Sequence, residues 1–200
     1  TLAAMGMFLG MNAATTANTI MFATYFNKAS MSGLIQMIGF LPMFIFMPFI
    51  TKIVNKYGKK EASVFGTIVS LIGGAVMLVF PTINNPDIAL VVYLLALVIY
   101  GVGMGVYTCV SWAMMGDAID YNEWKTGKRE EGTVYAAYSL ARKLVQAIVG
   151  SIGGFALAAI GYQSGAATQT PEVAEGIRTI VTLVPLIGYA FGAICLKFIY

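Results

Sequence analysis

The cationic pair Arg142 and Lys143 lies about ten residues into a segment that is otherwise free of charge. A charge near the centre of a membrane-spanning helix costs about 2.5–3.5 kcal/mol, so such groups are kept where they face water or a partner. At about 100° per residue, several polar side chains share one helix face with this pair. They are Tyr135, Tyr138, Ser139 and Gln146. The face predicts a water-filled path that binds a polar solute. The alternative is that the long stems, that of Arg142 above all, reach the lipid headgroups.

The densest charge in the chain is an acidic and basic island over residues 117–132. Asp117 and Asp120 are three residues apart, which places both carboxylates on one face of a helix end. Lys125 and Arg129 follow closely enough to form ion pairs with them. The alternative is a solvated loop, in which each exposed pair contributes at most about 1 kcal/mol. The island also contains Tyr121 and Glu123.

A second polar face recurs at helical spacing in the first apolar segment, and it consists of Asn12, Thr15, Thr16, Asn18 and Thr19. These groups either line a hydrophilic cavity or form hydrogen bonds between helices, each worth about 0.6 kcal/mol. Trp112 in a later segment offers a ring that can stack on the apolar face of a bound solute. More often, an aromatic residue near a helix end anchors the helix at the membrane interface, which is the alternative for Trp112.

The charge pattern predicts the elements that position these residues. Only 10% of the chain is Asp, Glu, Lys or Arg, against about 25% in soluble domains, and the mean hydropathy is +0.79. A helix needs about 20 mostly apolar residues to cross the hydrocarbon layer. The uncharged stretches therefore predict an all-α membrane protein with six transmembrane helices. They are expected over residues 2–26, 31–51, 61–80, 88–112, 133–162 and 177–197.

The distribution of basic residues predicts the orientation in the membrane, because basic loops stay in the cytoplasm. Lys28 and Arg178 fall on one side of the six expected helices. The other side carries Lys52, Lys56, Lys59, Lys60, Lys125, Lys128, Arg129 and Lys197. Both ends of this chain are therefore expected in the cytoplasm. Glycine pairs four residues apart predict close helix packing at 6/10, 101/105, 150/154 and 188/192.

Several classes of function are not expected. The chain has no histidine, which excludes histidine proton relays, most zinc sites and every Ser-His or Cys-His nucleophile. The clustered carboxylates lie in a loop with no nucleophile beside them, so neither an enzyme nor a metal site is expected in this chain. A net charge of +3 is too small and scattered for a nucleic acid partner.

The island, with Asp117, Asp120-Tyr121, Glu123-Trp124-Lys125-Thr126-Gly127, Arg129 and Gly132, resembles the signature of the glycoside-pentoside-hexuronide:cation symporters. This family includes the melibiose and glucuronide permeases of the major facilitator superfamily. Ser139 and Lys143 on the following helix also fit. The resemblance covers the whole chain as the C-terminal six-helix bundle of a twelve-helix fold. Its partner, an N-terminal six-helix bundle, is expected outside this sequence.

The resemblance implies transport of a sugar or glycoside coupled to Na⁺, H⁺ or Li⁺ by alternating access, in a bacterial inner membrane. No cofactor is implied, and the coupling cation is expected to bind mainly in the N-terminal bundle. The substrate-binding residues expected here are Lys143, Ser139, Tyr138, Gln146, Asn18 and Trp112. The expected cytoplasmic gate consists of Asp117, Asp120, Tyr121, Glu123, Lys125 and Arg129.

Two alternatives stay open. The same fold could carry an anionic lipid or an acidic or sulfonated sugar, with Arg142 and Lys143 pairing with its anionic group. The chain could also belong to a membrane sensor that transports nothing.

Overall fold

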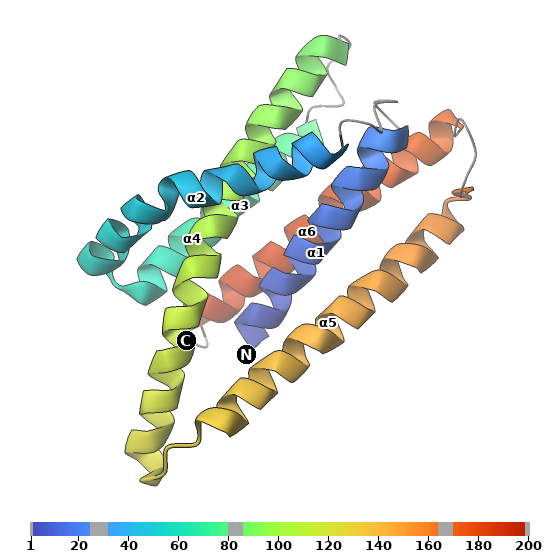
Figure 1. The fold of residues 1–200 in the computed structure, drawn as a ribbon. Helices are drawn as coiled ribbons and strands as arrows, with labels where there is room; N and C mark the ends of the chain where they lie inside the picture. The colour runs from blue at the N-terminus through green and yellow to red at the C-terminus, as the bar shows by residue number, and fades with distance from the viewer. Residues whose placement is uncertain (1, 25–31, 80–85, 164–169, 199–200) are drawn as a thin grey trace.

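The computed structural model describes residues 2–24, 32–79, 86–163 and 170–198, and their regular structure is entirely α-helical. Within these residues, six helices follow one another along the chain, and Figure 1 shows their arrangement. They are α1 (Leu2–Thr24), α2 (Ser32–Tyr57), α3 (Lys59–Val79), α4 (Pro86–Thr126), α5 (Glu131–Ala159) and α6 (Pro171–Phe198). The all-α prediction is confirmed.

Five of these helices, α2 to α6, are long and apolar enough to cross a membrane. Helix α1 is not among them, although six crossings were expected. Its sequence contains Asn12, Thr15 and Asn18, whose side chains lower its hydropathy. The last two residues of the first expected helix, 25 and 26, lie outside the described residues.

Several helices run beyond the uncharged stretches that predicted them. Helix α4 does not end near 112 but continues to Thr126, through the first half of the charged island. A helix can leave the membrane and continue in water, so loss of hydrophobicity marks the membrane surface rather than the helix end. The actual stop is Gly127, whose φ of 70° is favourable for glycine and whose N–H donates to the Glu123 carbonyl.

The sixth helix was expected over residues 177–197, but α6 already begins at Pro171. Proline is favoured at the first helical position because its missing N–H would have no partner there. The carbonyl of Thr170 accepts a bond from the Ala174 N–H at 3.0 Å, which starts the helix.

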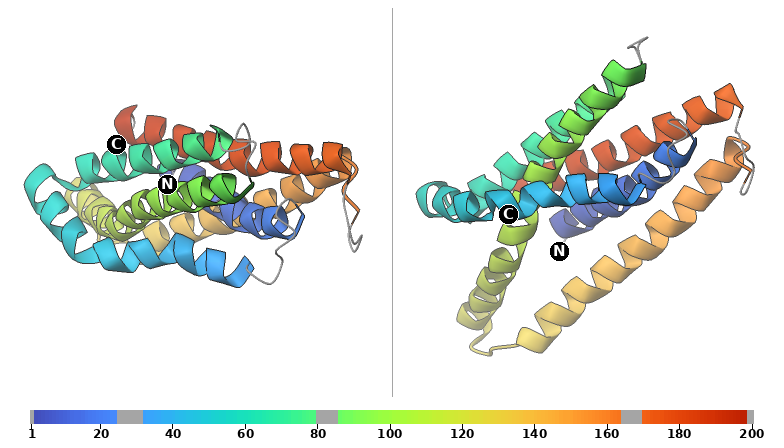
Figure 2. Two further views of the ribbon diagram at one scale, coloured as in Figure 1. Left: turned by 90° about the horizontal axis from the view of Figure 1, so that it is seen from above. Right: turned by 45° about the horizontal axis from the view of Figure 1, so that its top comes forward.

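The helices pack most extensively in two pairs, α1 with α6 and α3 with α4, and α2 lies across α4 (Figures 1 and 2). The α1–α6 contact depends on glycine. A Cβ added at Gly188 would lie 2.6 Å from the Gly10 nitrogen and 2.8 Å from the Gly6 oxygen. Gly150 and Gly154, in contrast, have no neighbour within 4 Å of such an atom, so the predicted packing role of that pair is wrong for the described residues.

Helix α5 lies at the edge of the bundle, beside α1, and its backbone approaches that of α4 at few positions. It buries a single stripe, Tyr138, Ala141 and Val145, spaced three and four residues apart. Its first turns and the last turns of α4 extend together past the neighbouring helices (Figure 1). The charged island therefore lies at the end of the bundle where α1 begins and α6 ends.

Candidate functional site

The expected polar face of α5 is divided between the surface and the interior of the bundle. Lys143 and Gln146 are exposed and Ser139 is half-buried, whereas Tyr138 points into the bundle. No described carboxylate forms an ion pair with Lys143. An ammonium group without a counter-charge, on a helix of membrane-spanning length, can bind hydroxyl or anionic oxygens of a solute.

Arg142 is half-buried and lies against α1. Its guanidinium carbon is 5.0 Å from the centre of the Phe8 ring, within cation–π distance. Like its neighbour Lys143, it forms no ion pair with the described side chains. The cation therefore packs on a neighbouring helix instead of extending freely toward the headgroups.

An aromatic cluster joins three helices beside Arg142. The ring of Tyr138 lies 6.1 Å from Phe8 of α1, edge to face, and 6.0 Å from Trp112 of α4. Trp112 also lies 6.2 Å from Tyr135. The structure thus brings together Trp112 and Tyr138, which were both predicted to contact substrate. With Trp112 still 44% exposed, one part of its ring is free to contact a solute.

Asn18 lies apart from this cluster. It is ten residues from Phe8 on α1, which corresponds to about 15 Å along a helix. Its amide oxygen accepts a short hydrogen bond from the Tyr93 hydroxyl of α4, and Thr19 accepts one from Gln36 of α2 at 3.0 Å. These contacts are hydrogen bonds between helices, which were expected as the alternative to a hydrophilic cavity. Asn18 therefore does not share a site with Trp112 and Tyr138, although all three were expected to bind substrate.

Arg129 organises the charged island. Its guanidinium donates to Glu131 at 2.5 Å, to Glu123 at 2.7 Å and to Asp120 at 3.2 Å. The bonds to Glu131 and Glu123 raise the pKa of the guanidinium above its ordinary value, so it stays charged. All three carboxylates belong to the α4–α5 connection or its flanks, and the network therefore stabilises that connection.

The other residues of the expected gate have different partners. Asp117 does not pair with Lys125 or Arg129 but with Lys59 at the start of α3, at 2.5 Å. Lys125 forms no ion pair with any described side chain. The Tyr121 and Trp124 rings lie 5.9 Å apart on the exposed end of α4. Lys59 was not predicted as a site residue. The expected orientation nevertheless places the basic loop that contains Lys59 on the same side of the membrane as the charged island.

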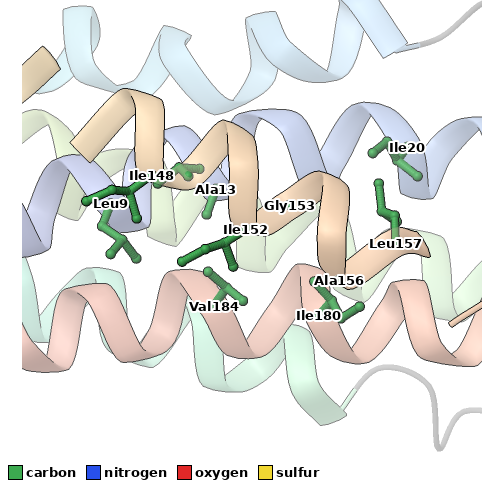
Figure 3. A pocket seen from close by; sticks show the side chains of 11 residues that line it. Leu9, Ala13, Ile20, Ile148, Ile152, Gly153, Ala156, Leu157, Ile180 and Val184 are labelled. Carbon is green, nitrogen blue, oxygen red and sulfur yellow. The ribbon is translucent and has the colours of Figure 1, made fainter. Parts of the chain in front are cut away.

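An aliphatic cleft lies between α1, α5 and α6 (Figure 3). Ile148, Ile152 and Leu157 line it from α5, facing Leu9 of α1 and Val184 of α6. No side chain on its walls carries a nitrogen or oxygen atom. It therefore offers nothing to orient a polar solute.

Comparison with known proteins places the chain among transporters. The family model described as MFS/sugar transport protein matches residues 2–200. The uncharacterized symporter YjmB of Bacillus subtilis (strain 168) is 31% identical over 157 residues, which are 78% of this chain and 33% of that protein. The glucuronide carrier protein homolog of Escherichia coli (strain K12) is 39% identical over 138 residues, 69% of this chain and 29% of that protein.

The isoprimeverose transporter of Lactiplantibacillus pentosus is 28% identical over 200 residues, 96% of this chain and 39% of that protein. The chain thus spans about a third of the length of the curated relatives that it matches. All three relatives are named for transport, and none is named as an enzyme.

Proposed function

Because the chain belongs to the MFS/sugar transport family, we propose that it forms the C-terminal six-helix bundle of a carrier for a sugar or glycoside. In this proposal, a coupling cation (Na⁺, H⁺ or Li⁺) drives transport by alternating access, and a second bundle from the rest of the protein completes the path. The supporting observation is Lys143, an exposed ammonium without an ion-pair partner among the described residues, on an apolar helix of membrane-spanning length.

Three of the expected substrate residues have a chemical role in this proposal. The ammonium group of Lys143 donates hydrogen bonds to substrate oxygens, and the Gln146 amide both donates and accepts them. The exposed part of the Trp112 ring stacks on the apolar face of a sugar ring. Lys143 forms no ion pair with a carboxylate of the described residues. Acids that bind the coupling cation are therefore expected in the N-terminal bundle.

The charged island is proposed to act as the cytoplasmic gate. Its ion pairs lie in water, where exchange between partners costs little. When the two bundles close on the cytoplasmic side, Arg129 or the unpaired Lys125 exchanges its local contacts for carboxylates of the other bundle. When they open, Arg129 returns to Glu123 and Glu131, the contacts described above.

An acidic sugar is a second candidate substrate. Arg142 and Lys143 supply two adjacent cations, and neither has an ion-pair partner among the described side chains. A carboxylate or sulfonate on the solute would neutralise them. A relative named for glucuronide transport, a class of sugar that carries a carboxylate, is consistent with this substrate.

Uptake by the full-length protein, reconstituted in liposomes with an imposed cation gradient, tests the proposal. Lys143→Ala is expected to lower the uptake rate at least tenfold, because substrate oxygens lose their charged donor. Lys128→Ala in the exposed island is the control and should transport normally. Unchanged uptake in Lys143→Ala would remove this residue from the site, and sugar binding without uptake by the unmodified protein would favour the sensor.

Competition separates the two substrate classes. Methyl β-D-glucuronide and methyl β-D-glucoside differ in whether carbon 6 is a carboxylate or an alcohol. Stronger inhibition of uptake by the glucuronide favours the acidic sugar, and its advantage should disappear in Lys143→Gln. Equal inhibition by both compounds would leave the neutral glycoside as the substrate class.

A further inference from the structure

An open groove lies between α2 and α3, next to the turn that joins them. The two helices meet at Gly58, whose φ of 90° is favourable for glycine, and then diverge (Figures 1 and 2). The groove has a volume of about 460 Å³. Its lining residues are Ile53, Tyr57, Glu61, Ala62 and Phe65. Tyr57 and Phe65 are 59% and 52% exposed, so the two aromatic rings present apolar surface to whatever surrounds the groove.

The groove lies where two helices of membrane-spanning length end on one side of the bundle. The candidate spans are Gly33–Tyr57 in α2 and Lys59–Leu78 in α3, and the groove is formed by the last turns of one and the first turns of the other. It is at the end of the bundle that carries the charged island, because Lys59 pairs with Asp117. In a membrane, this apolar surface would therefore meet the headgroups and the outer part of the acyl chains.

Lysines dominate the charge around the turn. Lys52, Lys56 and Lys60 form no ion pair with any described side chain. The Lys56 ammonium lies 5.1 Å from the centre of the Tyr57 ring, which places it at the rim of the groove. Glu61 is the one acid in the sequence from 52 to 61. It lies in the first turn of α3, where the helix N-terminus stabilises a carboxylate. The turn is therefore positively charged overall.

We propose that this groove binds an anionic phospholipid of the surrounding bilayer. The lipid phosphate lies against Lys56, with Lys52 and Lys60 adding attraction, and one acyl chain lies between Ile53 and Phe65. Basic pockets between membrane helices recognise such headgroups. A headgroup that also carries an ammonium group is disfavoured, because the lysines repel it. The lipid is a bound partner and not the transported solute, so the proposal stands separately from the proposed function.

Native mass spectrometry of delipidated full-length protein measures the binding. Phosphatidylglycerol, phosphatidylethanolamine and phosphatidylcholine with identical acyl chains are each titrated, and the dissociation constant of the first bound lipid is compared. Phosphatidylglycerol is expected to bind several times more tightly than the other two. Equal or tighter binding of phosphatidylethanolamine would overturn the proposal, because its ammonium group would then be pairing with Glu61.

A variant at the rim assigns the lipid to this groove. Lys56→Gln is expected to weaken the first phosphatidylglycerol about fivefold, the contribution of one lysine near an anionic surface. Lys197→Gln is the matched control and should retain full affinity. Lys197 is also exposed in the last turn of its helix, α6, and lies 5.7 Å from the centre of the Phe198 ring. Unchanged affinity in Lys56→Gln, or equal losses in both variants, would overturn the proposal.

The apolar wall is tested in the same assay. Phe65→Ala should also weaken the first phosphatidylglycerol, because the acyl chain loses its contact with the ring. Ile72→Ala, at a 53% exposed position of the same helix, is the control and should bind normally. Glycerophosphoglycerol, which is the headgroup without acyl chains, should not displace the lipid even in large excess. Displacement by this compound, or equal losses in Phe65→Ala and Ile72→Ala, would contradict a lipid seated in the groove.

Discussion

Tyr100 and Tyr189 join α4 to α6 through a hydrogen bond between their hydroxyl groups, whose oxygen atoms are 2.9 Å apart. Both side chains are buried, and their rings meet edge to face. In Tyr100→Phe, the hydroxyl of Tyr189 would be left buried without this partner, which costs about 1–3 kcal/mol. We therefore expect a lower Tm in a thermal-shift assay of the purified full-length protein.

The double variant Tyr100→Phe/Tyr189→Phe serves as the control for this prediction. It removes both hydroxyls and leaves no polar group unpaired, so part of the stability should return. A double variant less stable than Tyr100→Phe would show that the bond is not the cause.

A second prediction about a single residue concerns Arg129 and the transport rate. Its raised pKa keeps it charged throughout the physiological range, so changes in its contacts must come from movement and not from loss of its proton. Arg129→Gln should lower the maximal uptake rate, since it cannot hold the carboxylates electrostatically. Arg129→Lys should retain part of the rate, and Lys128→Gln should retain nearly all. If Arg129→Gln transports at the normal rate, the gate assignment is wrong.

Among the helices, the crossing of α1 and α6 is most sensitive to side-chain size. A methyl group at Gly188 would meet the backbone of Gly10 and Gly6, which cannot move aside as a flexible side chain could. Gly188→Ala should therefore destabilise the protein by roughly 1–3 kcal/mol, as overpacking typically does. The measurement is again the Tm of the purified protein.

Gly116→Ala in α4 is the matched control for this crossing, because nothing lies within 4 Å of an added Cβ there. Alanine is the better helix former, so this variant should be unchanged or more stable by about 0.5–1 kcal/mol. Equal effects at Gly188 and Gly116 would show that helix propensity, not packing, governs both positions.

The helices were predictable because long uncharged stretches need no tertiary information to be recognised. The ends of the helices were harder to predict. Helix α4 continues into water as far as Gly127, whereas the charge pattern indicates only where the membrane surface lies. Helical spacing alone indicates which residues share one face of a helix, as for Lys143 and Gln146, which are both exposed on α5. It does not indicate contacts between helices, since the partner of Asp117 is Lys59, 58 residues away, and Tyr138 turns inward.

For the whole molecule, the expected orientation is a prediction that labelling can check. Lys128 at the island end and Thr170 at the opposite end are both exposed. A membrane-impermeant maleimide should label Thr170→Cys in intact cells and Lys128→Cys only in inverted vesicles. The unmodified protein is the control, because it shows any labelling of the native cysteines Cys109 and Cys195. The reverse pattern would place both ends of this chain outside the cytoplasm.

The 41 residues of α4 form a rod of about 60 Å, twice the thickness of the hydrocarbon layer. Such a rod acts as a lever, because a few degrees of tilt within the membrane displace its outer tip by several ångströms. The Arg129 network lies at that tip and links it to the start of α5. A small tilt of α4 around a bound solute would therefore produce a larger displacement at its end in water. The start of α5 would move together with that end.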